Sequence, residues 1–221
     1  EKICYPVSEG GLGFRSFAHM SSAFACKLWW RLRKNESLWA HFMHAKYVRG
    51  KHPLQVKVAR PSAAWRRLEG IRRVAENHIR WCVGRGFVDL WYDRWLFEVP
   101  LADLVSIPDP PHMLLAEFFD DRGCNVEKLQ QWVPAQLVHQ IQDIQLFPEQ
   151  QDRMVWVGSP TGEFATKAAW EVSRLKQNAS MLDGFVWTRI VPLKISCFAW
   201  KVLRNLIPLE TVLQRRGVPL A

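Results

Sequence analysis

Residues 79–95 read IRWCVGRGFVDLWYDRW and form the most strongly patterned stretch of this 221-residue chain. Two apolar runs, 79–83 and 87–91, flank Gly84-Arg85-Gly86, and glycines between such runs are typical of a tight turn. Isoleucine, valine and aromatic residues are frequent in both runs, as they are in strands. The pattern predicts a β-hairpin that ends in the tryptophan-rich sequence Trp91 to Trp95.

Three helices are predicted upstream of this stretch. Apolar residues recur at helical spacing from Phe17 to Leu32, after a glycine-rich turn at 8–13. Asn35 or Ser37 is suited to cap a second helix through residue 47, which Gly50 and Pro53 would end. A third begins at Pro61-Ser62, with an apolar stripe that comprises Trp65, Leu68, Ile71 and Ala75.

Downstream, a proline-rich segment at 99–112 reads as a linker or extended crossover. A helix is predicted over 125–147, a second hairpin over 154–164 and a helix from Thr166. Two or three further helices are predicted at 184–191, 193–206 and 209–216. We therefore expect a mainly α fold with two small β-hairpins (α+β). The expected domains are a basic helical connector (1–98), a linker (99–112) and a helical subdomain (113–221).

Positive charge is concentrated in the first third of the chain. The net charge is +9, but residues 1–80 hold 16 Lys/Arg against 5 Asp/Glu, and residues 81–150 hold 4 against 11. Such asymmetry indicates an anionic partner for the first third, although solvated helix faces would give the same pattern. No apolar run is long enough to cross a membrane. An odd number of cysteines without a signal sequence fits a reducing compartment, nuclear or cytoplasmic.

No catalytic site is expected in this chain. Phe118-Phe119-Asp120-Asp121 resembles the aromatic-x-Asp-Asp turn that binds metal ions in polymerases, but a polar break follows it and a proline-rich stretch precedes it. We interpret it as an exposed acidic loop. His41, His44 and His52 lack a nearby carboxylate or cysteine that would complete a metal site. We expect no cofactor and no small-molecule ligand.

The predicted function therefore rests on the basic surface and its possible contacts with phosphates. Lys46, Arg49, Lys51, Lys57 and Arg60 fall in or near the loop between the second and third helices. Trp30 is the best candidate to stack on a base, although a core role is the default for every tryptophan here. Arg72 projects near the apolar stripe and is less favoured than Arg66 or Arg73. The nucleic-acid-binding residues predicted in this way are Trp30, Arg31, Arg33, Lys34, Lys46, Arg49, Lys51, Arg66 and Arg73.

Four blocks resemble the plant LINE-type (non-LTR) retrotransposon reverse transcriptases. They are Cys4 to Arg31 with its Glu9-Gly10-Gly11-Leu12-Gly13 turn, Trp81 to Trp95, Asp152 to Trp170, and the string Pro192-Leu193-Lys194-Ile195-Ser196-Cys197-Phe198-Ala199-Trp200-Lys201. The last resembles the start of the reverse transcriptase zinc-binding domain. The family usually has serine where Ala165 and Ala168 stand, which leaves Thr166 to cap the helix there.

This resemblance implies a position between the polymerase and the zinc-binding or RNase H part of a longer protein that performs RNA-directed DNA synthesis. The chain begins without Met, and it carries none of the family's catalytic residues. Zinc and magnesium would be held only by the neighbouring parts. The expected function is a noncatalytic connector that binds the backbone of RNA or DNA. A protein-interaction scaffold and a degenerate remnant without retained function are the alternatives.

Overall fold

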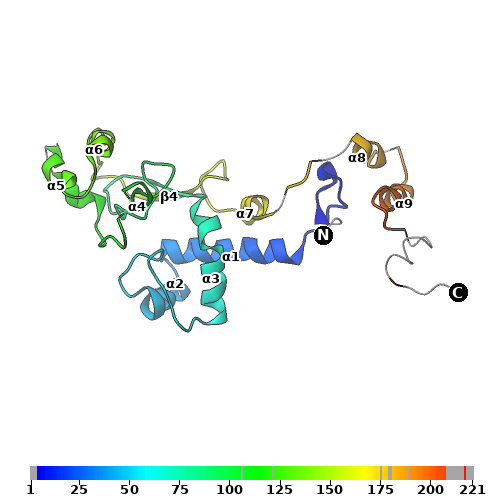
Figure 1. Ribbon diagram of the computed structural model, residues 1–221, viewed down its shortest axis with the longest axis horizontal. Coiled ribbons are helices and arrows are strands. Elements are labelled where there is room, and N and C mark those ends of the chain that lie inside the picture. The colour runs from blue at the N-terminus through cyan, green and yellow to red at the C-terminus, as the bar shows by residue number, and fades with distance from the viewer. Residues whose placement is uncertain are drawn as a thin grey trace. The chain divides into compact units, whose positions relative to one another are not determined.

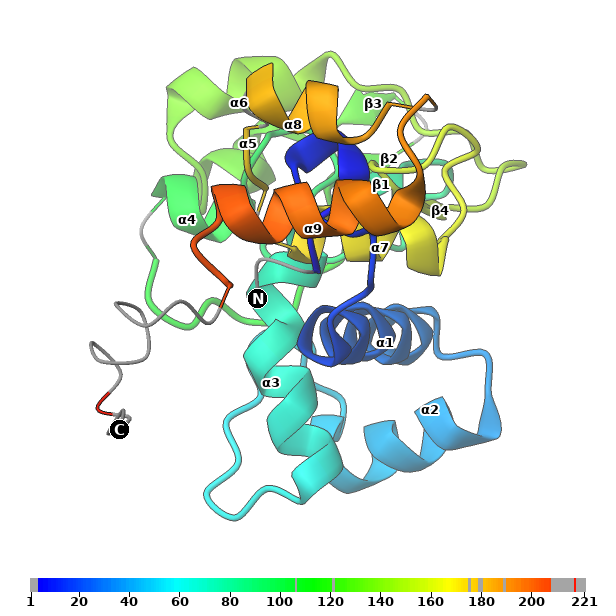
Figure 2. The ribbon, with the colours of Figure 1, turned by 90° about the vertical axis from the view of Figure 1, so that its right-hand side faces the viewer.

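The computed structural model describes residues 4–105, 107–120, 122–174, 176–178, 181–188, 190–207 and 217. Contacts divide the chain into two compact units. The larger unit comprises residues 21–173, and the smaller unit combines residues 1–20 with residues 174–221. Figures 1 and 2 show their helices and strands from two directions. None of the helices in the described ranges is long and apolar enough to span a membrane.

The three predicted N-terminal helices are present. They are α1 (Phe17–Lys34), α2 (Leu38–Met43), which continues as the π-helical turn η3 (His44–Val48), and α3 (Ala63–Glu76). The hydroxyl oxygens of Ser37 and Ser62 cap α2 and α3 by accepting hydrogen bonds from backbone N–H groups. The predicted stripe of α3 is buried throughout. In both views α2 lies near the N-terminal end of α3, and the loop of residues 49–62 joins them.

The predicted hairpin at 79–91 is wrong in its strand pairing. Strand β1 (Ile79–Cys82) pairs instead with β4 (Arg153–Trp156), antiparallel, with Ile79 opposite Trp156. Residues 87–91 are held by a different partner, residues 113–115. The Leu90 N–H donates to the Met113 carbonyl at 2.8 Å, and the Leu115 N–H donates to the Val88 carbonyl at 3.0 Å. Both halves of the patterned stretch therefore pair with distant segments.

The Gly84-Arg85-Gly86 turn is built around the carboxylate of Asp152. Its two oxygens accept hydrogen bonds from the backbone N–H groups of Gly84 (2.7 Å), Gly86 (2.9 Å) and Phe87 (2.7 Å). A Cβ atom at Gly84 would lie 2.2 Å from the Gln150 carbonyl oxygen, and Gly86 has a φ of +82°. Glycine is therefore required at both positions, for close approach and for the left-handed backbone respectively.

The second predicted hairpin is half correct. Strand β4 and the turn after it are present, and the Trp156 N–H donates to the Gly162 carbonyl at 2.7 Å. Residues 163–164 form no strand, and the strand that pairs with β4 is β1. A further hairpin, β2 (Phe119–Asp120) with β3 (Gly123–Cys124), was not predicted. The fold class is nevertheless confirmed: mainly α, with two small antiparallel two-stranded sheets.

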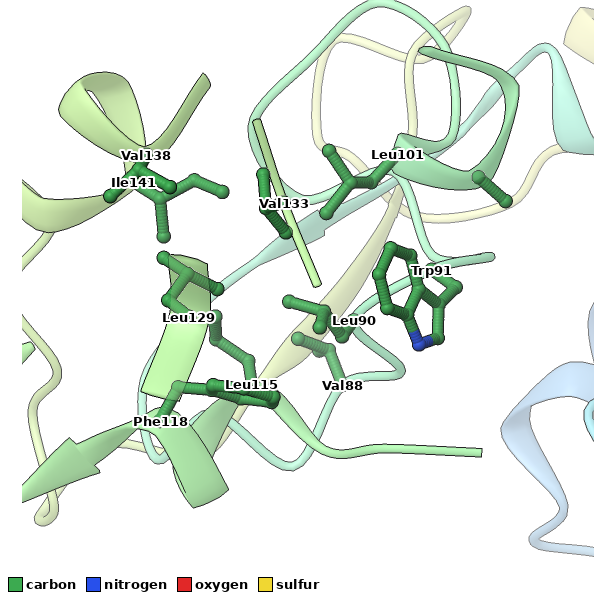
Figure 3. Close-up of a cluster of buried hydrophobic side chains, with 11 residues drawn as sticks. Val88, Leu90, Trp91, Leu101, Leu115, Phe118, Leu129, Val133, Val138 and Ile141 are labelled. Carbon is green, nitrogen blue, oxygen red and sulfur yellow. The ribbon is translucent and has the colours of Figure 1, made fainter. Parts of the chain in front are cut away.

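The core of the larger unit draws on both sides of the proline-rich segment (Figure 3). Leu101 and Ala102 of α4 (Leu101–Val105) are buried in it. So are side chains of η4 (Leu115–Phe118), α5 (Val126–Gln130) and α6 (Ala135–Gln142). The expected helix at 125–147 is interrupted by Pro134, which lacks an N–H and disfavours helix in the residue before it. The domain boundaries drawn from composition stay a prediction.

Helix α7 (Thr166–Ser173) begins at the predicted residue. In the smaller unit, α8 (Met181–Val186) lies earlier than predicted, α9 (Leu193–Leu203) lies within the predicted range, and the expected helix at 209–216 lies outside the described residues. A short helix, η2 (Val7–Glu9), is joined to α9 because Trp200 Nε1 donates to the Gly10 carbonyl at 2.6 Å. The start of the first block of the family resemblance and the last block thus lie in one unit.

The cysteines differ in their accessibility, which gives a prediction. Cys26 is buried in α1, and burial raises the pKa of its thiol to about 12. Only about one thiol in ten thousand would then be ionised at pH 8, and the thiolate is the reactive form. Cys82 is exposed. We expect a maleimide to label Cys82 rapidly at pH 8 and Cys26 only after unfolding, as peptide mass spectrometry would measure. Labelling of both at similar rates in the folded protein would contradict the burial.

Candidate nucleic-acid interface

A hollow of about 560 Å³ lies between η3 and the loop that follows it. We call it the basic hollow, because half of its lining residues are cations and none is acidic. Its cations are Lys46, Arg49, Lys51, Lys57 and Arg60. Its other lining residues are Tyr47, Val48, Val56, Val58 and Ala59.

The basic hollow forms because the chain reverses direction after η3. Arg49 and Gly50 both adopt left-handed backbone conformations, with φ of 51° and 77°. Gly50 takes this conformation without steric cost, whereas Arg49 adopts it at a steric cost from its Cβ. Arg49 Nε also donates to the Lys46 carbonyl at 3.2 Å. The turn therefore places cations from before and after it on one concave surface.

Two buried or half-buried side chains hold the loop of the basic hollow in place. The His52 imidazole is buried; its Nδ1 accepts from the Leu54 N–H and its Nε2 lies 3.2 Å from Asp93 Oδ1. Because Nδ1 accepts a hydrogen bond, Nε2 is the ring nitrogen that donates to Asp93. Arg72 donates to the Leu54 and Val56 carbonyls at 3.2 Å. Its role is therefore to position the loop.

The cations of the basic hollow have no carboxylate partner in the part of the chain that the structure describes. Lys46 instead lies over aromatic rings, with its Nζ 5.2 Å from the Tyr47 ring centroid. A hydrogen bond from Ser62, assisted by the nearby Lys46 charge, holds the pKa of Tyr47 below its usual value. Five like charges on one small surface repel one another, and an anion bound among them would relieve that repulsion.

Two of the predicted binding residues are in the core, which corrects the sequence-based prediction. The side chain of Arg33 is buried: its Nε lies 2.9 Å from Glu76 Oε1, and its NH2 group contacts Asp93. Burial alone opposes its charge, but the two carboxylates outweigh burial and raise the pKa of Arg33. It cannot reach a phosphate, because α1 directs its side chain into the interior.

Trp30 is the second correction, because only 5% of its surface is exposed. Its ring meets Trp156 edge-on at a centroid distance of 6.1 Å, and it packs against Phe164 at 5.9 Å. A base can stack only on an exposed ring face. Trp30 is therefore a core residue, which is the role expected of a tryptophan because burying an indole removes a large apolar area from water.

Arg31 and Lys34 line a separate hollow of about 430 Å³ that also contains acids. Lys34 Nζ lies 3.8 Å from Glu163 and 4.0 Å from Glu36, so much of its charge is compensated. Arg31 is exposed. This second hollow is less suited to a polyanion than the basic hollow, because any phosphate there would also face two carboxylates.

The remaining predicted residues divide into two groups. Lys46, Arg49 and Lys51 come together in the basic hollow, whereas Arg66 and Arg73 are exposed on α3 and do not line it. Lys57 and Arg60 complete the basic hollow but were not among the chosen residues, although their place in the basic loop was visible in the sequence. Phe42, an exposed ring beside Lys46, was not among the predicted binding residues either.

The histidines do not gather at one point: His41 Nε2 meets the Asn35 carbonyl, and His44 Nε2 meets the Leu32 carbonyl. Among the described residues, no group of three His, Cys, Asp or Glu side chains is suited to hold a metal ion. Asp120 is exposed, and its Oδ1 accepts from the Arg122 N–H within the β2–β3 turn. Asp121 lies outside the described residues.

Residues 164–221 match the protein family described as zinc-binding in reverse transcriptase. The match confirms the family resemblance. A relative from Arabidopsis thaliana, whose name describes it as a ribonuclease H protein, is 27% identical over 97% of this chain. The chain spans 37% of the length of that relative. No solved structure matches.

The residues of this chain do not fit the zinc ion that the family's description names. A structural zinc site needs four Cys or His ligands in close spacing. The matched segment, 164–221, contains one cysteine, Cys197, and no histidine. We therefore derive no role for zinc in this chain.

Proposed function

We propose that this chain is a noncatalytic connector of a retroelement-type protein, and that it binds the sugar-phosphate backbone of RNA or DNA at the basic hollow. The observation that supports this proposal most directly is the hollow's five cations without an acidic lining residue. The net charge of +9 and the match to a reverse transcriptase family agree with it. Backbone contacts give affinity without sequence readout, so we propose no base-specific recognition here.

The positioning of the loop also supports the proposal. His52 and Arg72 hold the loop's backbone, so the cations around it are presented on a fixed frame. A fixed frame lowers the entropy that is lost when a ligand is bound. Arg72 and His52 thus contribute to the site without contacting the ligand.

Salt titration tests the proposal. We expect binding of a fluorescein-labelled 20-nucleotide RNA, followed by anisotropy, to weaken steeply as KCl rises. Replacing Lys51 and Lys57 by glutamine removes two phosphate contacts, which should flatten the slope of log K against log salt by about 1.4 for a single strand. Arg122→Gln is the matched control, since Arg122 is an exposed cation outside the basic hollow. Equal slopes for wild type and the double variant would overturn the assignment.

The exposed face of α3 is tested in the same assay. Charge reversal at Arg66 and Arg73 is expected to weaken binding further, because both side chains are exposed and carry charge that a long strand can reach. Unchanged binding would confine the interface to the basic hollow. Weak, salt-independent binding together with self-association in light scattering would instead favour the protein-interaction scaffold.

A further inference from the structure

Helix α2 exposes two large apolar side chains, one helical turn apart. Leu38 is 87% exposed and Phe42 is 57% exposed, while Ala40 and Met43 on the other side of the helix are buried. Residues i and i+4 share one face of a helix, so Leu38 and Phe42 form a continuous apolar strip. Exposed apolar strips of this kind are costly in water and commonly mark binding surfaces.

Lys46 connects this strip to the basic hollow. Its Nζ lies 5.6 Å from the Phe42 ring centroid, and Lys46 is itself one of the hollow's lining residues. A ligand whose anionic groups enter the basic hollow would therefore bring its neighbouring parts to the Phe42 ring. In a nucleic acid those neighbouring parts are the sugar and the base.

Phe42 is also the ring at this border that is free to stack. The other ring beside Lys46, Tyr47, already stacks on Trp65 at a centroid distance of 4.5 Å and an interplanar angle of 24°. Phe42 makes no ring–ring contact in the described part of the chain. Trp30, which the sequence favoured for stacking, is buried.

We propose that Phe42, beside exposed Leu38, stacks on unpaired bases, so that the site selects single-stranded over double-stranded nucleic acid. This inference rests on the proposed backbone binding at the basic hollow. In a duplex the base faces already stack on one another inside the helix, so they are not accessible to an aromatic side chain. In a single strand the base faces are accessible, and stacking on an aromatic side chain is tolerant of sequence.

The test compares Phe42→Ala with wild type on a single-stranded RNA and on its duplex. Loss of one stacked base predicts about 5- to 150-fold weaker single-strand binding, with duplex binding and both salt slopes unchanged. Phe42→Trp should restore single-strand binding, because an indole also stacks. Phe147→Ala, which removes an exposed ring outside the basic hollow, should change neither single-strand binding nor duplex binding.

Two results would overturn the stacking role. One is single-strand binding that Phe42→Ala leaves unchanged; the other is an equal loss on single strand and duplex, which would indicate a structural effect. Failure of the proposed function looks different, because wild type would then show no salt-dependent binding to either RNA. Circular dichroism melts of each variant would verify that this exposed substitution leaves the fold intact.

Discussion

Replacing Arg33 by alanine is expected to destabilise the larger unit by about 3–5 kcal/mol, the usual cost of removing one partner from a buried ion pair. Arg33 joins Glu76 of α3 to Asp93, and all three side chains are buried. Trp29 Nε1 donates to the same Glu76 carboxylate at 2.7 Å, and His52 contacts Asp93. Without Arg33, two carboxylates would remain buried without their cation.

Urea unfolding at pH 7, followed by tryptophan fluorescence, measures this loss. Arg31→Ala is the matched control, since it removes an exposed arginine two residues away on the same helix. We expect it to change stability by less than about 0.5 kcal/mol. A cost below 1 kcal/mol for Arg33→Ala would mean that the carboxylates find other partners or are hydrated.

The pH dependence of the loss tests its electrostatic cause. Burial acts to raise the pKa of Asp93, but Arg33 and His52 outweigh it and lower the pKa below its usual value. The stabilisation from ionised Asp93 is therefore fully present above the unfolded-state pKa of about 3.9 and is lost as the pH falls through the folded-state pKa. The unpaired carboxylates of the variant can be neutralised by protonation in acid. The difference between wild type and Arg33→Ala should accordingly shrink towards acidic pH.

The role of Arg33 shows where sequence reasoning reaches its limit. The three basic residues in the last turn of α1 were all predicted to bind nucleic acid, and Arg31 is exposed as that prediction requires. Arg33 differs because its partners are 43 and 60 residues away in the sequence. Nothing local in the sequence distinguishes a surface arginine from one that is paired through the fold.

Local features, by contrast, were predictable. The caps at Ser37 and Ser62, the buried stripe of α3 and the start of α7 at Thr166 depend on residues within one or two helical turns. Strand pairing depends on contacts across the whole larger unit, so β1 was given the wrong partner. The basic hollow was partly predictable: its cations stand close together in the sequence, but its concave shape depends on the left-handed turn at Arg49-Gly50.

The clearest long-range feature is Asp152, and replacing it by alanine is expected to cost about 3 kcal/mol. Its carboxylate accepts three backbone hydrogen bonds from the turn at Gly84–Phe87, and hydrogen bonds to a charged group contribute about 1.5–3 kcal/mol each. Part of that loss is recovered because water can reach the opened turn. Asp152 also directly precedes β4, so the same residue fixes the turn after β1 and the strand that pairs with β1.

Asp152→Asn separates geometry from charge in that interaction. Oδ1 accepts from Gly84 and Gly86, whereas Oδ2 accepts from Phe87 alone. An asparagine keeps one acceptor oxygen, so it can retain the two glycine bonds and should cost only about 1–2 kcal/mol. Asp143→Ala, at an exposed carboxylate after α6, is the control in the same urea titration. If Asp152→Ala proved as harmless as this control, the glycine geometry alone would hold the turn. The intermediate loss for asparagine is the result that the three hydrogen bonds require.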